Sequence, residues 1–441
     1  MQEIVYDFIG IGLGPFNLSL ASLAAPLKGH SSLFMDMSDE FNWHPGMLLN
    51  DATMQTPFIA DLVTLADPTS PYSFLNYAKE SGRLYSFYIR EDFFLLRQEY
   101  NHYCQWVAKQ LPNLRFNQFV ELAHYDDKTG CYELLCIDTS NGRQRRYRCK
   151  RLVLGTGTHP WVPACCDSVR KHLIHSADYL PNRERLWERK NITVVGSGQS
   201  AAEIYYDLLR ERPKHQYGLN WITSSPRFFP LEYTKLTLEM TSPDYIDYFH
   251  ALPESEREQL LKEQKNLYKG INRSLINAIF DEMYKQKLQG LPDPDLFTNT
   301  KLLACRRDET TGKFELALQH TQQKAAFHQR CDALVMATGY AYRQPAFLQG
   351  IANRLRHDRQ GRLAVARNYS VDTQGKEVFV QNAELHTHGF TAPDLSMACY
   401  RNSVILREML GQAPYSVEER IAFQHFGIPH NRTHLREQAW G

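Results

Sequence analysis

Two glycine-rich turns, each directly after a short apolar run, constrain the fold of this 441-residue chain more than any other feature. The first, GIGLGP at residues 10–15, follows the run IVYDFI, and the second, GSGQSA at 196–201, follows ITVV. Such short runs are typical of strands buried on both faces of a parallel sheet, and a helical pattern follows each turn. The repeat predicts an α/β fold with two Rossmann-like dinucleotide-binding domains.

Glycine is required in such turns because a residue without Cβ lets the backbone approach a pyrophosphate, which then lies on the N-terminus of the next helix. In the first turn we assign this role to Gly10, Gly12 and Gly14, with Pro15 in the third glycine position of the motif. Asp36, 22 residues beyond Gly14, is the acid expected to bind a ribose. Alone, this turn also fits a β–α connection that binds nothing.

The second turn matches the GxGxxA pattern in full. The strand expected to end at 221–223 is followed by no acid, and a nearby Arg227 favours a 2′-phosphate, hence NADPH over NADH. A solvated surface arginine is the alternative. The residues assigned to this nucleotide are Gly196, Gly198, Gln199, Ser200, Ser224 and Arg227.

Two turns in one chain are best explained by a flavin on the first and a nicotinamide on the second, which is typical of an oxidoreductase. Two further β-runs end in GTG at 155–157 and ATG at 337–339, as expected where the chain crosses between the two domains. Residues 181–190 are expected to form a linker. The predicted layout is an FAD-binding domain in two parts (1–187 and 336–430), an NADPH-binding domain (188–335) containing a helical substrate region (about 236–290), and a tail (431–441).

Composition excludes several other classes of protein. The 50 Lys and Arg against 49 Asp and Glu leave no basic surface for nucleic acid or for a membrane. The uncharged stretch 8–27 is interrupted by glycines and prolines, so we do not expect it to span a membrane. Nine cysteines without a CxxC pair predict no metal site, no disulfide reductase, and a reducing, cytoplasmic location.

An ordered set of segments makes the chain resemble the microbial N-hydroxylating monooxygenases of siderophore biosynthesis, which act on lysine, ornithine or diamines. The resemblance runs from about Asp7 to Leu410. Its segments are GLGPFNLS at 12–19, WHPGM at 43–47, MQ at 54–55, PTSPYSF at 68–74, GSGQSA at 196–201, Asp332, ATGY at 337–340, Pro345, HG at 388–389 and LS at 395–396.

The resemblance implies a mechanism. NADPH reduces FAD, the reduced flavin takes up O2 as a C4a-hydroperoxide, and a neutral primary amine attacks its distal oxygen to give a hydroxylamine while NADP+ stays bound. By family position Trp43, His44 and Gln55 lie near the flavin, and Asn266 lies near the nicotinamide and the substrate. Gln55 and Asn266 are the residues assigned to catalysis, in the sense of positioning, and Ala337, Thr338, Gly339 and Leu395 are assigned to cofactor binding. A homo-oligomer, either dimer or tetramer, is also implied.

The substrate is predicted from one departure from the family pattern. The amino-acid hydroxylases have a lysine that pairs with the substrate carboxylate, and this chain has Ala60 there. A buried carboxylate without a cation is costly, so we expect a diamine such as cadaverine or putrescine. Lys235 or Lys265 could replace the missing cation, which keeps L-lysine or L-ornithine open as substrates; an NADPH oxidase or a flavin-binding scaffold is more remote. The residues assigned to the substrate are Ala60, Asn266, Asp394 and Ser396, although Asp394 equally fits an ordinary turn.

Overall fold

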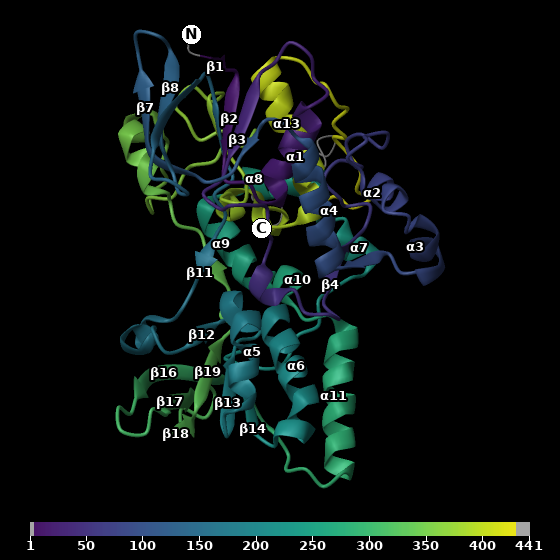
Figure 1. Ribbon diagram of the computed structural model, residues 1–441, viewed down its shortest axis with the longest axis vertical. Helices are drawn as coiled ribbons and strands as arrows, with labels where there is room; N and C mark the ends of the chain where they lie inside the picture. The colour runs from purple at the N-terminus through teal and green to yellow at the C-terminus, as the bar shows by residue number, and fades with distance from the viewer. Residues whose placement is uncertain (1–3, 429–441) are drawn as a thin grey trace, which may run out of the picture.

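The computed structural model describes residues 4–428, and two parallel five-stranded sheets organise it into an upper and a lower body (Figure 1). The sheet of the upper body has the order β21-β10-β2-β3-β6. Its strands are β2 (Phe8–Ile11), β3 (Ser32–Met35), β6 (Leu114–Arg115), β10 (Leu152–Leu154) and β21 (Val378–Val380). Three adjacent strands of this sheet, β21, β10 and β2, come from distant parts of the chain. The upper body is therefore formed by two separate segments, the second of which lies near the C-terminus.

Both faces of this upper sheet are buried. Phe8 packs toward α1 (Pro15–Ala24), α4 (Arg97–Gln110) and α13 (Ala398–Leu410), whereas the next residue, Ile9, packs on the opposite face. That opposite face is covered by an antiparallel sheet and by a 3-10 segment. The covering elements are β7 (Gln118–Asp126), β8 (Cys131–Asp138), β9 (Gln144–Cys149), to which β1 (Val5–Tyr6) is added, and η4 (Ala346–Arg354). This two-sided burial explains why β2, β10 and β21 contain only apolar residues and one glycine.

The lower body is built on the order β12-β19-β13-β14-β15, again all parallel. These strands are β12 (Ile174–His175), β13 (Asn191–Val195), β14 (Gly218–Ile222), β15 (Asp295–Phe297) and β19 (Ala333–Met336). One face is covered by α5 (Tyr179–Trp187), α6 (Gln199–His215) and α11 (Arg273–Leu288), the other by β16 (Thr300–Arg307), β17 (Phe314–His320) and β18 (Ala326–Cys331). The predicted α/β fold with two Rossmann-like domains is confirmed.

The predicted helical region is helical but does not form one unit. Its first helices are α7 (Lys235–Leu238), α8 (Pro243–Ala251), α9 (Glu254–Glu263) and α10 (Lys265–Lys269), which lie where the two bodies meet (Figure 1). Tyr245 and Phe249 of α8 pack against Phe390, which belongs to the second part of the upper body. By contrast, α11 packs along α6 of the lower body, because Leu275, Ile279 and neighbouring apolar residues face that core.

The boundary between the bodies differs from the predicted one. The expected linker at 181–190 is wrong, because α5 covers most of it; Pro181 is tolerated there since the first turn of a helix has no N–H partner to lose. β12 lies upstream of residue 188 and yet pairs with β19 of the lower sheet. The predicted tail, 431–441, lies outside the described residues. Within residues 4–428, no helix is both long and apolar enough for a membrane span.

Candidate functional site

The first glycine turn connects β2 to α1 and is held tightly against β10. A Cβ on Gly12 would lie 2.4 Å from the carbonyl oxygen of Gly155, and Gly12 has a φ of +85°, so only glycine fits. A Cβ on Gly14 would instead meet open space. Gly14 caps α1, Pro15 begins it, and the first turn of this helix carries no acidic side chain. A free helix N-terminus that faces open space fits a pyrophosphate.

Asp36, at the carboxyl end of β3, faces the same turn. Its Oδ2 accepts a hydrogen bond from the backbone N–H of Leu13 at 2.7 Å, and its Oδ1 accepts one from Ser38 N–H at 2.8 Å. Each carboxylate oxygen keeps a further lone pair, so the carboxylate can also accept from ribose hydroxyls. The remaining glycine, Gly10, packs on Phe34, whose ring leaves no room for a Cβ.

The second turn, between β13 and α6, has the same construction. A Cβ on Gly196 would lie 2.2 Å from the carbonyl oxygen of Ala337, and Gly198 caps α6, again without an acid in the first turn. Gln199 is the first residue of the helix, and Ser200 follows it half-buried. Beyond β14, Ser224 and Arg227 are exposed, with the Arg227 guanidinium 4.6 Å from the ring centroid of Phe229. An exposed arginine at this strand end suits a 2′-phosphate.

The predicted GTG and ATG segments both lie where the chain crosses between the bodies. After 155–157 comes β11 (His159–Pro160), and after 337–339 comes β20 (Tyr340–Ala341); the two pair antiparallel. The carbonyl oxygen of Gly339 accepts from Trp161 N–H at 2.9 Å and from Nε2 of His175 at 3.1 Å, and the Thr338 hydroxyl donates to the Trp161 carbonyl oxygen. The predicted cofactor residues Ala337, Thr338 and Gly339 therefore lie at the junction, beside the second turn.

The WHPGM segment meets this junction from the upper body. The Tyr340 ring has its centroid 5.5 Å from that of His44, and the Trp43 and His44 rings are 4.8 Å apart. The pKa of His44 is lowered to about 4, chiefly because the surrounding protein desolvates the ring and also because of the charge of Arg97. The imidazole is therefore neutral at pH 7, although the residue retains solvent access. The segment is fixed by Gly46, where a Cβ would lie only 1.8 Å from the Ala177 carbonyl oxygen.

Gln55, in β4 (Thr53–Pro57), has a buried side-chain nitrogen with no hydrogen-bond partner among residues 4–428. An unpaired buried N–H is costly, so this amide is best explained by a bound polar group such as a flavin. The predicted flavin residues thus fit a dinucleotide: an open helix N-terminus, an acid at the ribose position and an unsatisfied amide.

The residues predicted to bind the substrate come from three segments. Ala60 is buried just after β4, and Asn266 is half-buried on α10, where its side-chain amide makes no hydrogen bond to residues 4–428. Asp394 caps the N-terminus of η6 (Leu395–Met397), where its Oδ1 accepts from the backbone N–H and the hydroxyl of Ser396 at 2.8 and 2.7 Å. Its Oδ2 has no hydrogen bond within the described residues. Burial raises the pKa of Asp394, and the hydrogen bonds from Ser396 oppose this shift. Leu395 packs against the upper core.

The lysines considered as replacement cations, Lys235 and Lys265, are both exposed. Within residues 4–428, no group of three or more His, Cys, Asp or Glu side chains is arranged to hold a metal ion.

Comparison with known proteins identifies the family. The model of the L-lysine 6-monooxygenase/L-ornithine 5-monooxygenase family matches residues 4–342. The chain belongs to this family. A putrescine N-hydroxylase from Shewanella oneidensis is 53% identical over 426 residues, which covers 97% of this chain and 85% of that protein. The crystal structure of FAD-bound DfoA, a cadaverine monooxygenase of the desferrioxamine pathway from Erwinia amylovora, has a TM-score of 0.96 and 57% identity, covering 98% and 100%. An L-lysine N6-monooxygenase from Escherichia coli is 33% identical over 413 residues, covering 92% and 95%.

Sequence reasoning overlooked residues that hold the turns of this monooxygenase family member in place. Asn17 is fully buried in α1: its Nδ2 donates to the Gly12 carbonyl oxygen at 2.7 Å, and its Oδ1 accepts from Gln381 at 2.6 Å. The signal available was the one amide side chain in a helix of apolar residues and two serines. No local signal marks the ion pair between Arg97 and Glu203, which joins the two bodies.

Proposed function

We propose that this chain is an FAD- and NADPH-dependent monooxygenase that hydroxylates one amino group of a short linear diamine, cadaverine or putrescine, for hydroxamate siderophore biosynthesis. The observation that carries the proposal is the buried alanine at position 60, in a chain that is more than half identical to a putrescine and a cadaverine enzyme. No lysine is available at this position to pair with a carboxylate. A diamine brings no carboxylate, so none is needed.

Different residues of the chain would bind the two cofactors. The first turns of α1 and α6 would bind the pyrophosphates of FAD and NADPH, and Asp36 would bind the flavin-side ribose. Gln55 would donate its unpaired N–H to the flavin. When bound, FAD supplies the oxygen-activating chemistry and NADPH supplies the reducing equivalents.

The amine must be neutral at the reacting end and cationic at the far end. Asp394 is proposed to bind the far ammonium through Oδ2, because Oδ1 is already used by Ser396. Asn266, whose amide is unpaired among the described residues, is proposed to orient the reacting amine and the nicotinamide. Excluding water around these groups would keep the oxygen chemistry that the cofactor supplies from being lost to solvent, and it would strengthen both polar contacts.

The test is a substrate panel of cadaverine, putrescine, L-lysine and L-ornithine with the purified FAD-loaded protein. Hydroxylamine formation and NADPH consumption are both measured. Hydroxylated product from a diamine, with amino acids giving NADPH oxidation without product or no reaction, is the expected result. Efficient hydroxylation of L-lysine would overturn the diamine assignment, and NADPH oxidation without product from any amine would indicate an oxidase instead.

The oligomeric state and the compartment are also proposals. A homo-oligomer, dimer or tetramer, is supported by α3 (Leu84–Arg90), which projects from the upper body with Tyr85, Tyr88 and Ile89 largely exposed (Figure 1). Light scattering should show an oligomer that Tyr88→Lys together with Ile89→Lys dissociates; a monomeric parent would contradict this.

A cytoplasmic location is supported by nine cysteines that are all free thiols.

A further inference from the structure

A buried ion pair joins the flavin-side body to the nucleotide helix of the other body. Arg97, the first residue of α4, donates to Glu203 of α6 in a bidentate pair, with 2.8 Å from Nη1 to Oε2 and 2.7 Å from Nη2 to Oε1. The two side chains are only 12% and 4% exposed. Arg97 also donates to the Met47 carbonyl oxygen at 2.9 Å, which ties the pair to the WHPGM segment. Bidentate pairs of this kind fix orientation as well as distance.

The same carboxylate holds the second glycine turn. Oε1 of Glu203 accepts a hydrogen bond from Nε2 of Gln199 at 2.9 Å, one helical turn earlier. Oε1 of Gln199 in turn accepts from the backbone N–H of Asn272 at 2.8 Å, at the start of α11. Both polar atoms of the Gln199 amide, Nε2 and Oε1, are therefore hydrogen-bonded to other residues of the chain. A continuous set of hydrogen bonds runs from the flavin-side segment at Met47 to the turn that is proposed to bind NADPH.

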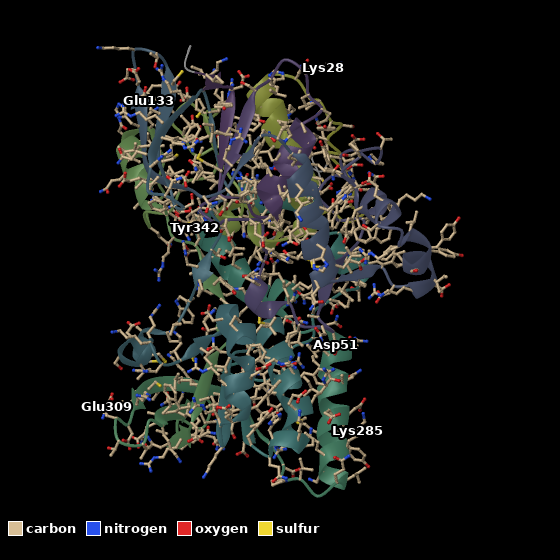
Figure 2. The ribbon with its side chains drawn as sticks, in the orientation of Figure 1. Lys28, Asp51, Glu133, Lys285, Glu309 and Tyr342 are labelled. Carbon is tan, nitrogen blue, oxygen red and sulfur yellow. The ribbon has the colours of Figure 1, made fainter. Side chains whose placement is uncertain are left out.

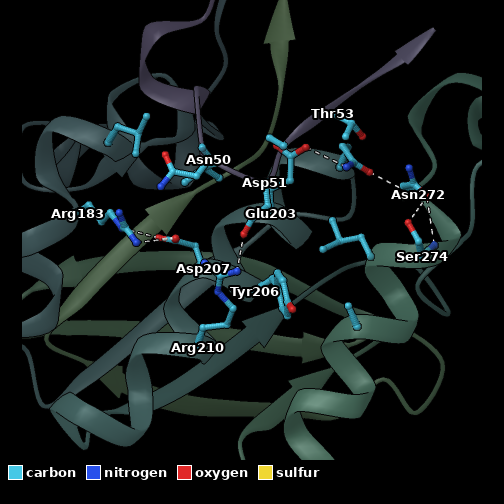
Figure 3. A pocket seen from close by; sticks show the side chains of 16 residues that line it. Asn50, Asp51, Thr53, Arg183, Glu203, Tyr206, Asp207, Arg210, Asn272 and Ser274 are labelled. Atoms are coloured by element: carbon cyan, nitrogen blue, oxygen red, sulfur yellow. Dashed lines mark hydrogen bonds and ion pairs between the residues drawn. The ribbon is translucent and has the colours of Figure 1, made fainter. Parts of the chain in front are cut away.

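A second ion pair crosses the same interface without touching the turn. Asp51, which lies at the junction of the two bodies (Figure 2), pairs with Arg210 two turns further along α6, at 2.5 Å. Figure 3 shows both Glu203 and the Asp51–Arg210 pair lining one cavity between the bodies. The Asp51 and Arg210 side chains are 66% and 40% exposed, and exposed pairs contribute little. A variant of this pair therefore serves as the matched control: it removes a contact between the two bodies without removing a contact to the 196–201 turn.

We propose that Glu203 is a positioning residue for hydride transfer: with Arg97 it fixes Gln199 and the 196–201 turn relative to the flavin-side body. In that step a hydride leaves NADPH, which becomes NADP+, and its two electrons reduce the flavin. The donor and acceptor sites are on different bodies, so their separation depends on contacts between the bodies. A displacement of about 1 Å at such a site can cost on the order of 100-fold in rate. This inference rests on the proposed FAD and NADPH function.

The test compares Glu203→Gln, Gln199→Ala and Asp51→Asn in the FAD-loaded protein without any amine. The affinity for NADP+ is measured by calorimetry, the rate of flavin reduction by anaerobic stopped flow, and stability by thermal unfolding. We expect Glu203→Gln and Gln199→Ala to weaken NADP+ binding and to slow flavin reduction by about 10- to 100-fold. Asp51→Asn should leave both values within about twofold of the parent, as expected for an exposed pair.

Two results would overturn the inference. One is a folded Glu203→Gln protein with a lowered melting temperature but unchanged NADP+ affinity and reduction rate, which would make the residue purely structural. The other is an equal loss in Asp51→Asn, which would implicate the interface in general. If Glu203→Gln does not fold, Arg97→Lys decides, because it keeps a positive charge beside Glu203 but cannot make the bidentate pair, and unchanged NADP+ affinity and reduction rate in it would equally overturn the inference. A parent protein that neither binds NADP+ nor accepts its hydride would instead refute the proposed function, and lack of product from diamines would affect neither measurement.

Discussion

The carboxylate of Asp36 accepts a hydrogen bond from the backbone N–H of Leu13, with 2.7 Å between nitrogen and Oδ2. The acid at the end of β3 therefore shapes the first glycine turn while it keeps lone pairs for a ribose. We predict that Asp36→Ala weakens FAD binding by about 10- to 100-fold, the range for losing hydrogen bonds to a charged group. Flavin content on purification and titration of the apoprotein measure this. The exposed neighbour Asp39→Ala is the control, and full flavin content in Asp36→Ala would contradict the assignment.

Gly14→Ala separates cofactor binding from folding. The added methyl group would meet no protein atom within 4 Å, so the apoprotein should unfold at the temperature of the parent apoprotein. It would, however, occupy the space proposed for the flavin pyrophosphate, and we expect FAD affinity to fall. Gly12→Ala is the contrasting variant, because its methyl group would collide with Gly155 and the protein should fold poorly. Normal FAD affinity in Gly14→Ala would place the pyrophosphate elsewhere.

The parts of the site that sequence predicted are those that local chemistry dictates. Glycine is required at positions 12 and 196 because a Cβ there would collide with the backbone just after a neighbouring strand. The glycine-rich motif of a few residues reveals this requirement in the sequence. Proline and charge at 181–190 predict a loop, but packing of Leu186 and Trp187 against the core of the lower body makes 181–187 helical. The pairing of Arg97 with Glu203 could not be found, since 106 residues separate two side chains that each fit a solvated helix surface.

Ala60→Lys tests substrate choice. Ala60 is buried, so the new ammonium would lie beside the proposed diamine site, where two like charges in a low dielectric repel strongly. We expect kcat/KM for the diamine to fall by about tenfold or more, equivalent to at least about 1.4 kcal/mol. Ile59→Lys is the matched control, because its neighbouring side chain is exposed and should leave diamine turnover unchanged. An unchanged KM in a folded Ala60→Lys protein would contradict the role of position 60.

His388 predicts a loss of stability in acid. The ring is fully buried, stacks 4.5 Å from Tyr369, and has Nε2 3.3 Å from the Arg367 carbonyl oxygen, which can only accept; the neutral ring therefore carries its proton on Nε2. Burial first, then the charges of His250 and Arg367, lower the pKa of His388 well below its usual value.

Since the unfolded chain binds this proton near pH 6.5 and the folded protein does not, the stability contribution is complete above that pH and is lost as the pH falls. One such histidine should cost about 1.4 kcal/mol of unfolding free energy between pH 7.5 and 5.5. Urea unfolding at the two pH values measures it, and His388→Asn should reduce the difference by that amount, whatever its effect at pH 7.5. His30→Asn, at an exposed histidine, is the control for the effect of removing any histidine on the pH dependence of stability. An equal pH dependence in the parent and in His388→Asn would mean that the buried ring accepts a proton without unfolding.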